Sequence, residues 1–443
     1  MCTPKKYLVF VGIVLLTFPS CKDFLDVKPK GEIIPEKMNE FELMFNGPTL
    51  TNMVPLELEN ATDDTYQNYG LEALTREANV YFWRKNLDND VEATPQIWQA
   101  RYKTIYFCNY LIHNVMSAVD GSLQEKKAMI AQAKAIRATS FLYLLTAFSK
   151  AYQADQNPGD LGLALVTSTN VTDVIPQRST LKETVDDMVR DLTEAIADLP
   201  EQYNDRWRIT RYGAAGILSR LYLYIHDYPK ANEFAALAMN RPGPVKILDY
   251  NTIPNTSAFP AVGANVEKIW IDFSKISEGN MLTKELLNLY TKEDLRRKLL
   301  ISTGGAKMAN VVSGGIGFPE LYLTQAECLA RDNKPAEAMA LVNMIRKNRL
   351  PLNDPNVNLT ADDAAQALTH VLNERRRELA FCGTRWMDMK RLDMEGKMPP
   401  VNRYKNNDPT NTVVFTLAPK SASYTFEIPL KVQYLNPNIQ RNY

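Results

Sequence analysis

The sequence is poor in histidine and cysteine. It has 3 histidines and 5 cysteines in 443 residues, and His113, His226 and His370 lie far from one another and from any cysteine pair. The spacings typical of zinc sites, and the Cys/His arrangement of a nucleophile, are therefore absent. We expect no metal site, no cofactor and no enzymatic activity.

An excess of either charge is also missing. The chain has 51 basic and 51 acidic residues, and no basic run is longer than 375–377. A nucleic-acid-binding domain needs a basic patch that neutralises phosphates. We therefore expect no nucleic-acid partner.

The N-terminus has an apolar run that is too short to cross a membrane. It extends from Tyr7 to Leu16, follows Lys5 and Lys6 and precedes Cys21, whereas a spanning helix takes about 20 apolar residues. This order is typical of a secretory signal. We predict that residues 1–20 are a lipoprotein signal peptide and that Cys21 carries a membrane-anchoring lipid. The alternative is a plain secretory signal.

A short tether is predicted to follow the lipid. Residues 21–35 combine several charges with Pro29, Gly31 and Pro35, and prolines and glycines argue against a helix there. We expect a folded body, residues 36–443, to hang from this tether.

Three cysteines remain after the lipidated end. Cys108, Cys328 and Cys382 are an odd number and lie among apolar residues of helix-like segments. We predict that they are small buried side chains rather than disulfide partners.

Helical periodicity dominates the body. Apolar residues recur at steps of three and four over 125–152 and 182–199. Two helix pairs follow the pattern of a tetratricopeptide unit, with small residues on one stripe; they are 212–226 with 230–240, and 320–330 with 336–348. The sequence predicts a mostly α-helical body built from stacked helix pairs.

Two stretches interrupt the helical pattern. Residues 241–318 and 393–443 are rich in proline, glycine and asparagine. Strands are predicted at 268–273, 412–417 and 424–429. Irregular segments of this kind are where ligand or partner contacts usually lie.

The densest charge cluster occupies 373–391. Arg375 shares a helical face with apolar residues, so it needs a partner, and Glu374, Glu378 and Asp388 are the candidates. No histidine or nucleophile is nearby. We interpret the cluster as a structural ion-pair network rather than a catalytic site.

Several stretches of the sequence resemble the SusD/RagB family of outer-membrane lipoproteins of Bacteroidetes. They follow the order of that family and are 132–152, 160–165, 178–180, 210–238, 320–349, 373–391, 428–429 and 436–439. The resemblance implies a SusD-like fold with an N-terminal part at 36–270 and a C-terminal part at 271–443. Two features depart from the family: only Lys22 and Asp23 follow Cys21 directly, and the chain looks shorter than many members.

The same resemblance implies a function at the cell surface. Members bind a glycan, or in some cases a peptide, and hand it to a partner SusC-like TonB-dependent outer-membrane transporter. They are not enzymes. We accordingly expect an outer-membrane lipoprotein that faces outside.

Sugar binding needs aromatic faces together with carboxylate, amide or guanidinium groups. Residues 60–86 have that composition. The ligand-binding residues that we predict there are Asp64, Tyr66, Tyr69, Trp83 and Arg84. The alternative is that the aromatic run 81–83 packs into the body. Trp98 is expected in the core, whereas Trp207 lies in a polar stretch.

Two other functions stay open at this point. A lipid-anchored hydrolase would need two carboxylates that the fold brings together from distant positions. A tetratricopeptide-type scaffold would bind only protein. Neither the ligand nor the particular transporter can be read from the sequence.

Overall fold

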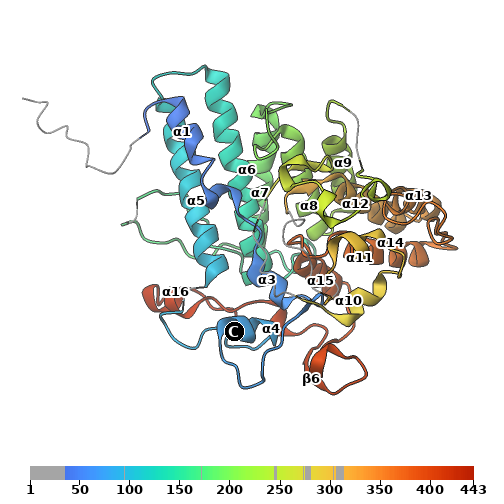
Figure 1. Cartoon of the computed structure of the whole chain (residues 1–443). Coiled ribbons are helices and arrows are strands. Elements are labelled where there is room, and N and C mark those ends of the chain that lie inside the picture. Colours follow the sequence, from blue (N-terminus) through green and yellow to red (C-terminus); the bar gives the residue numbers. More distant parts are fainter. Residues whose placement is uncertain are drawn as a thin grey trace, which may run out of the picture.

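The computed structural model describes residues 35–93, 95–170, 172–243, 247–272, 274, 281–302, 304–305 and 314–443 (Figure 1). The predicted signal peptide, Cys21 and nearly all of the predicted tether lie outside the described residues. Within the described residues, no helix combines the length and the apolarity that membrane crossing requires.

Helices form most of the body, as the sequence predicts. Their bounds are α1 Met38–Met44, α2 Pro48–Thr51, α3 Leu56–Ala61, α4 Arg76–Tyr81, α5 Gln96–Asn114, α6 Leu123–Phe148, α7 Leu181–Asp198, α8 Arg211–Tyr224, α9 Tyr228–Met239, α10 Lys284–Leu289, α11 Leu295–Leu300, α12 Phe318–Arg331, α13 Pro335–Arg346, α14 Ala364–Glu378, α15 Arg385–Met394 and α16 Leu430–Leu435.

Long helices stand side by side on one flank of the molecule (Figure 1). Helix α6 lies between α5 and α7 and is buried almost continuously from Ala131 to Phe148. Its start is fixed by a capping box, in which Ser122 and Glu125 each satisfy a backbone N–H of the other. The sequence therefore sets both the burial of this helix and its first residue.

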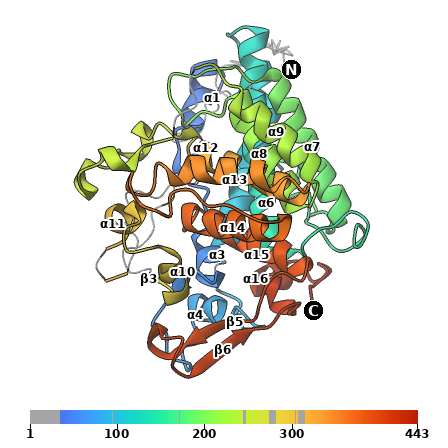
Figure 2. The same ribbon diagram turned by 90° about the vertical axis from the view of Figure 1, so that its right-hand side faces the viewer.

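Both predicted helix pairs are confirmed. Helix α8 packs on α9, and α12 packs on α13 and also contacts α9 and α14 (Figure 2). The small residues Ala231, Ala235 and Ala238 of α9 are fully buried. Helices can approach closely where such residues face a neighbour, which explains the stacked arrangement.

Three small antiparallel sheets join distant parts of the chain. Strand β1 (Thr65–Tyr66) pairs with β3 (Met281–Leu282), β2 (Lys268–Trp270) with β4 (Ile316–Gly317), and β5 (Val401–Tyr404) with β6 (Val413–Leu417). Strands β2 and β6 fall at predicted positions, whereas β5 was not predicted.

The predicted strand at 424–429 is wrong. A short 3-10 helix, Ala422–Tyr424, precedes extended chain there, and the Phe426 N–H donates to the Ala147 carbonyl of α6 at 2.8 Å. This segment is apolar because it packs against a helix end, not because it belongs to a sheet.

One hydrophobic core runs through the body. It contains Phe41 near the start of the described chain and Ile439 near its end. A smaller cluster lies among α12, α13 and α14, and Ala367 belongs to it. Both predicted parts of the body therefore contribute to one core, and the boundary at 270 stays a prediction.

The remaining cysteines behave as small apolar side chains. Cys108 and Cys328 are buried, Cys382 is half-buried, and all three are free thiols. Burial raises the pKa of the Cys328 thiol to about 12.

Candidate functional site

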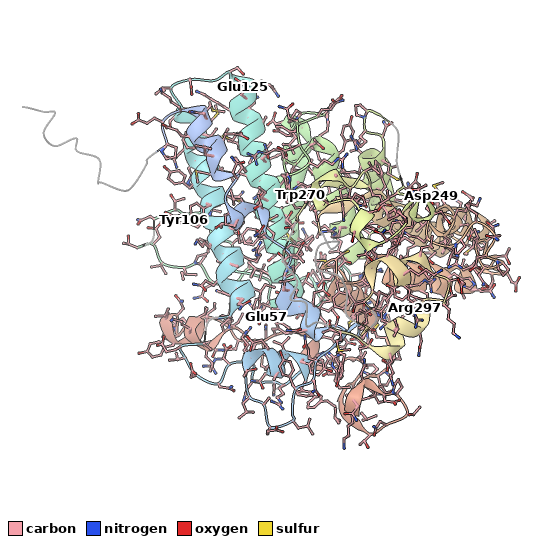
Figure 3. All side chains as sticks on the ribbon, viewed as in Figure 1. Glu57, Tyr106, Glu125, Asp249, Trp270 and Arg297 are labelled. Atoms are coloured by element: carbon pink, nitrogen blue, oxygen red, sulfur yellow. The ribbon has the colours of Figure 1, made fainter. Side chains whose placement is uncertain are left out.

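The segment that the sequence singled out, 60–86, lies at one end of the molecule. Figure 3 shows Glu57 of α3 near that end and Glu125, at the start of α6, at the opposite end. The segment runs from the end of α3 through β1 and an exposed loop into α4. Its position depends on side chains from the C-terminal part of the chain.

Two arginines of that C-terminal part hold the adjacent carboxylates of the segment. Arg385 donates to both oxygens of Asp63 at 2.7 Å, and Arg376 Nε donates to Asp64 Oδ1 at 2.6 Å. Burial alone would raise the pKa of Asp63, but the Arg376 and Arg385 guanidiniums hold it well below its usual range. Asp63 therefore stays ionised and paired.

A third arginine, Arg403 of β5, holds the segment by its backbone. It donates to the carbonyls of Asn60, Thr65 and Tyr81 at 2.9–3.1 Å. Its guanidinium also lies 4.0 Å from the Tyr81 ring centroid and 4.1 Å from that of Trp83. The sequence analysis missed this residue, because nothing local links position 403 to position 81.

Asp64 and Trp83 do not reach the surface. Asp64 is 0% exposed and Trp83 is 3% exposed, with its indole N–H donating to the Ala61 carbonyl at 2.7 Å. Neither side chain offers a surface to a ligand in this structure. For Trp83, packing into the body is the alternative that the sequence left open. We assign both residues a supporting role beneath the segment.

Tyr66, Tyr69 and Arg84 are half-buried. Tyr66 and Tyr69 belong to residues 66–74, which we call the tyrosine loop, and Arg84 contacts this loop from beyond α4. The Tyr69 ring stands edge-on to Tyr81, with centroids 5.7 Å apart. The Arg84 guanidinium donates to the carbonyls of Leu71 and Ala73 and so closes the loop.

Apolar side chains also project from the tyrosine loop. Leu71 is 52% exposed and Leu74 is 60% exposed. The loop thus presents two partly exposed tyrosine rings, a guanidinium and two leucines, on a base fixed by Arg376, Arg385 and Arg403. This surface can stack on and hydrogen-bond a ligand. Among the described residues, no group of three histidines, cysteines or carboxylates could hold a metal ion.

The charge cluster at 373–391 is a structural network, as predicted. Arg375 pairs with Asp388 at 2.8 Å, and Asp388 also accepts from Arg391 at 2.9 Å. The other two candidate partners are used elsewhere: Glu374 binds Arg296, Arg346 and Arg377, and Glu378 binds Arg296 and Arg349.

The two remaining tryptophans of the sequence analysis are both half-buried. Trp98 packs against Tyr102 and Phe148, with ring centroids 4.8 and 4.9 Å apart. Trp207 lies in a polar loop, where its backbone N–H donates to Asp205 at 2.8 Å.

Comparison with known protein families gives two matches. A model described as "Starch-binding associating with outer membrane" matches residues 23–223, and the SusD family model matches residues 318–443. A SusD-like protein of Formosa agariphila is 36% identical over 91 residues, which is 19% of this chain. That match spans only 18% of the relative's own length.

Solved structures share the fold. A putative sugar binding protein from Bacteroides vulgatus superposes with a TM-score of 0.72 at 21% identity, covering 93% of this chain and 99% of that one. A SusD superfamily protein from Bacteroides thetaiotaomicron superposes with a TM-score of 0.75 at 20% identity, covering 92% and 100%. The two family models match in chain order and together span most of the sequence, so this chain belongs to the SusD/RagB family.

Proposed function

We propose that this protein is an outer-membrane lipoprotein, anchored through Cys21 and facing outside, that binds a saccharide nutrient. It delivers this ligand to a partner SusC-like TonB-dependent transporter. Three observations support the proposal: the family, the lipoprotein-type N-terminal sequence, and fold relatives whose names describe sugar or carbohydrate binding.

The tyrosine loop is the proposed ligand contact, and its construction is the observation that carries the proposal. Tyr66 and Tyr69 offer partly exposed rings, and Arg84 both closes the loop and places a guanidinium beside them. Aromatic rings bind the apolar faces of sugars, and fixed polar groups bind the hydroxyls. Asp64 and Trp83 hold this surface from below.

Binding without cleavage is part of the same proposal. The carboxylates of the 373–391 cluster are engaged by arginines, so they are poor candidates for acid and base catalysis. A glycosidase needs one carboxyl group that stays protonated and a second that stays ionised. Glu374, held by three arginines, cannot act as the acid, because burial raises its pKa less than those arginines lower it.

A peptide is the second candidate ligand. Leu71 and Leu74 are exposed on the tyrosine loop, and apolar side chains of a peptide would cover them. A saccharide would instead be centred on Tyr66 and Tyr69. The two ligands therefore predict different sensitive residues on one loop.

Calorimetry of the full chain against plant, host and microbial glycans and a peptide library tests the proposal. We expect saturable binding to one glycan class, weakened at least ten-fold by Tyr69→Ala. The matched control is Tyr106→Ala, which removes an exposed tyrosine of α5, away from α4 (Figure 3). Cleavage of the glycan, or binding of peptides alone, would contradict the proposed saccharide-binding function.

The transporter partnership is tested separately. A tagged form of the full chain should co-purify with a SusC-like transporter from outer membranes solubilised in mild detergent. A chain with Cys21→Ala should be lost from the membrane fraction. Recovery of the tagged chain without any transporter would remove the delivery step and leave ligand binding as a separate question.

A further inference from the structure

A second concave site lies where the end of α6, helix α15 and the C-terminal segment meet. Its volume is about 410 Å³, within the range of roughly 300–1,000 Å³ typical of small-molecule pockets. We call it the tail cavity. The lining residues that carry the argument are Lys150, Gln156, Lys390, Lys420, Tyr424 and Tyr443. In Figure 2 the C-terminus lies on the same side of the molecule as α15 and α16.

The floor of the tail cavity contains a buried ammonium group. Lys390 is 2% exposed and donates to the carbonyl oxygens of Thr146, at 2.7 Å, and of Ser149, at the C-terminal end of α6. A positive charge at that end of a helix is favourable. Within the described part of the chain, no carboxylate lies within ion-pairing distance of Lys390.

A second buried cation lies behind the same helix end. Arg178 is 6% exposed and donates to the Phe148 carbonyl at 3.0 Å and to the Asn442 side-chain oxygen at 2.8 Å. It too has no ion-pair partner among the described residues. Most buried arginines elsewhere in the body are paired with carboxylates, for example Arg220 with Glu320. Neither of these two cations is therefore paired with a carboxylate.

The charged groups that line the tail cavity are unequal in number. Three lysines line it, against one aspartate. Lys150 is paired with Asp160 at 3.1 Å, outside the lining, and Asp393 accepts from the Lys420 backbone N–H at 2.9 Å. A ligand that brings a carboxylate would give Lys390 the ion-pair partner that it lacks among the described residues.

Groups suited to hydroxyls and to a sugar ring surround these lysines. Gln156 places an amide on the wall, and Tyr443 is 40% exposed. The amides of Asn157 and Asn442 are already hydrogen-bonded within the protein. Tyr424 is 4% exposed, and its hydroxyl group has no hydrogen-bond partner. Buried hydroxyls normally have one, so this group is a natural partner for a ligand.

The tail cavity borders the segment that follows the tyrosine loop. Lys85 Nζ lies 5.1 Å from the centroid of the Tyr443 ring, and Lys85 is the next residue after Arg84. A chain of sugar units could therefore pass from one site to the other.

We propose that the tail cavity binds a carboxylate-bearing sugar unit, a uronate, with its carboxylate at the lysines and its ring against Tyr443. The proposal rests on the proposed function only in taking the ligand to be a saccharide. The Gln156 amide and a partly exposed tyrosine ring suit a sugar better than a peptide, whose side chains would need apolar subsites.

The protonation state of Lys390 provides a second measurement that tests the proposal. Burial lowers the pKa of this ammonium to about 7. Its hydrogen-bond acceptors are carbonyls at the end of α6, and the titratable side chains that line the cavity with it are Lys150, Asp393, Lys420, Tyr424 and Tyr443. A bound carboxylate favours the charged form and raises this pKa. Binding at pH 7.5 should therefore take up a proton.

The test uses trimers of galacturonate, glucuronate and mannuronate, each beside its methyl ester, which has the same shape without the charge. Calorimetry with the full chain should show at least ten-fold tighter binding of one free acid than of its ester. The Lys150→Gln/Lys420→Gln variant should lose this difference. Lys334→Gln, a change at an exposed lysine of the α12–α13 turn, should keep it.

Proton uptake is measured by repeating the titration at pH 7.5 in two buffers of different ionisation enthalpy. Equal affinity for acid and ester in all three trimers would overturn the proposal, and so would tighter binding of triglutamate than of any uronate. Neutral glycans titrated into the same preparation report on the tyrosine loop. If neutral glycans do not bind, the proposed function is contradicted. The proposal for the tail cavity is tested by the comparison of acid and ester.

Discussion

Each buried charge of this protein has to be matched by a partner that compensates for its lost hydration. Asp63 meets Arg385 through two parallel hydrogen bonds of 2.7 Å, the geometry in which a guanidinium binds a carboxylate best. Removing one member of such a pair leaves the other charge buried and unpaired. Single residues of the C-terminal part can therefore determine whether the tyrosine loop is held in place.

The first prediction concerns that pair. Arg385→Ala should lower the free energy of unfolding by about 2–3 kcal/mol, because the half-buried Asp63 loses its two charged hydrogen bonds and keeps only Arg376, at 3.2 Å. Urea denaturation followed by tryptophan fluorescence measures the change. Lys182→Ala, which removes the exposed pair with Asp186, should leave the urea midpoint nearly unchanged. Equal losses in the two variants would contradict the structural role of Arg385.

The second prediction concerns Lys390 and pH. Its folded-state pKa, about 7, lies well below the 10.5 of a free lysine. Between pH 7 and pH 10 the unfolded chain therefore binds more protons than the folded chain, and folding stability rises with pH. The cost of burying the ammonium is fully present below pH 7.

Lys390→Met should lack this rise. Relative to the variant, the protein should gain roughly 3–5 kcal/mol in the free energy of unfolding from pH 7 to pH 10. Urea midpoints at closely spaced pH values give the two profiles, and the subtraction removes the titration of other groups. Parallel profiles would show that Lys390 is not desolvated as the structure has it.

Helices α8 and α12 are brought together through the short strand β4 that precedes α12. Gly216 of α8 faces Ile316 of β4, and a Cβ atom added at Gly216 would lie 3.1 Å from Ile316 Cγ1 and still closer to its Cγ2. The absence of a side chain at this one position therefore sets the distance between the two elements.

The third prediction tests that close approach. Gly216→Ala should destabilise the protein by about 1–2 kcal/mol, because overpacking costs about 1–3 kcal/mol and alanine recovers up to about 1 kcal/mol in a helix. Thermal denaturation measures the difference. Gly159→Ala, where an added Cβ meets nothing within 4 Å, should change stability by less than about 0.5 kcal/mol. A stabilised Gly216→Ala variant would mean that Ile316 can move aside freely.

Local signals explain which elements the sequence could predict. Helix α6 was predictable because its apolar periodicity and its Ser122–Glu125 capping box lie within the helix itself. The strand predicted at 424–429 was wrong, because the apolar residues of this segment are equally compatible with a strand. Its actual partner, Ala147, is far away in the sequence. Strand β5 was not predicted either, because its pairing with β6 is not visible in 401–404 alone.

Residues near both ends of the described chain belong to one core, which couples distant elements of the molecule. Phe426 is 3% exposed and lies against Phe148 and Trp386, with ring centroids 6.2 and 5.9 Å away. The C-terminal segment therefore covers the last turn of α6 and forms part of the core.

The fourth prediction follows from this coupling. Phe426→Ala should cost about 3–5 kcal/mol and should speed amide hydrogen exchange in the last turns of α6, at 141–148. Hydrogen exchange followed by mass spectrometry measures α6 and the C-terminal segment in one experiment. Leu430→Ala, a change at a more exposed residue of the same segment, is the control. Unchanged exchange in α6 would show that the segment folds independently of it.

The candidate site, like the strands, could be predicted from the sequence only in part. Composition pointed to the segment 60–86 and to Tyr66, Tyr69 and Arg84. Composition could not separate these from Asp64 and Trp83, which are buried. Their burial depends on Arg376 and Arg403, which lie more than 300 residues away in the sequence. Exposure of a tyrosine or tryptophan is set by such distant partners and not by its neighbours in the chain.

The anchoring of residues 60–66 by Arg376, Arg385 and Arg403 also has a kinetic consequence. The Asp63–Arg385 contact joins positions 322 residues apart, and closing so long a loop must precede any gain from the contact. The tyrosine loop is therefore among the last surfaces to take shape, after the C-terminal part has been synthesised and has docked. Ligand binding can then serve as an assay of completed folding, since a chain that stops before 376 has the loop's sequence but not its three anchors.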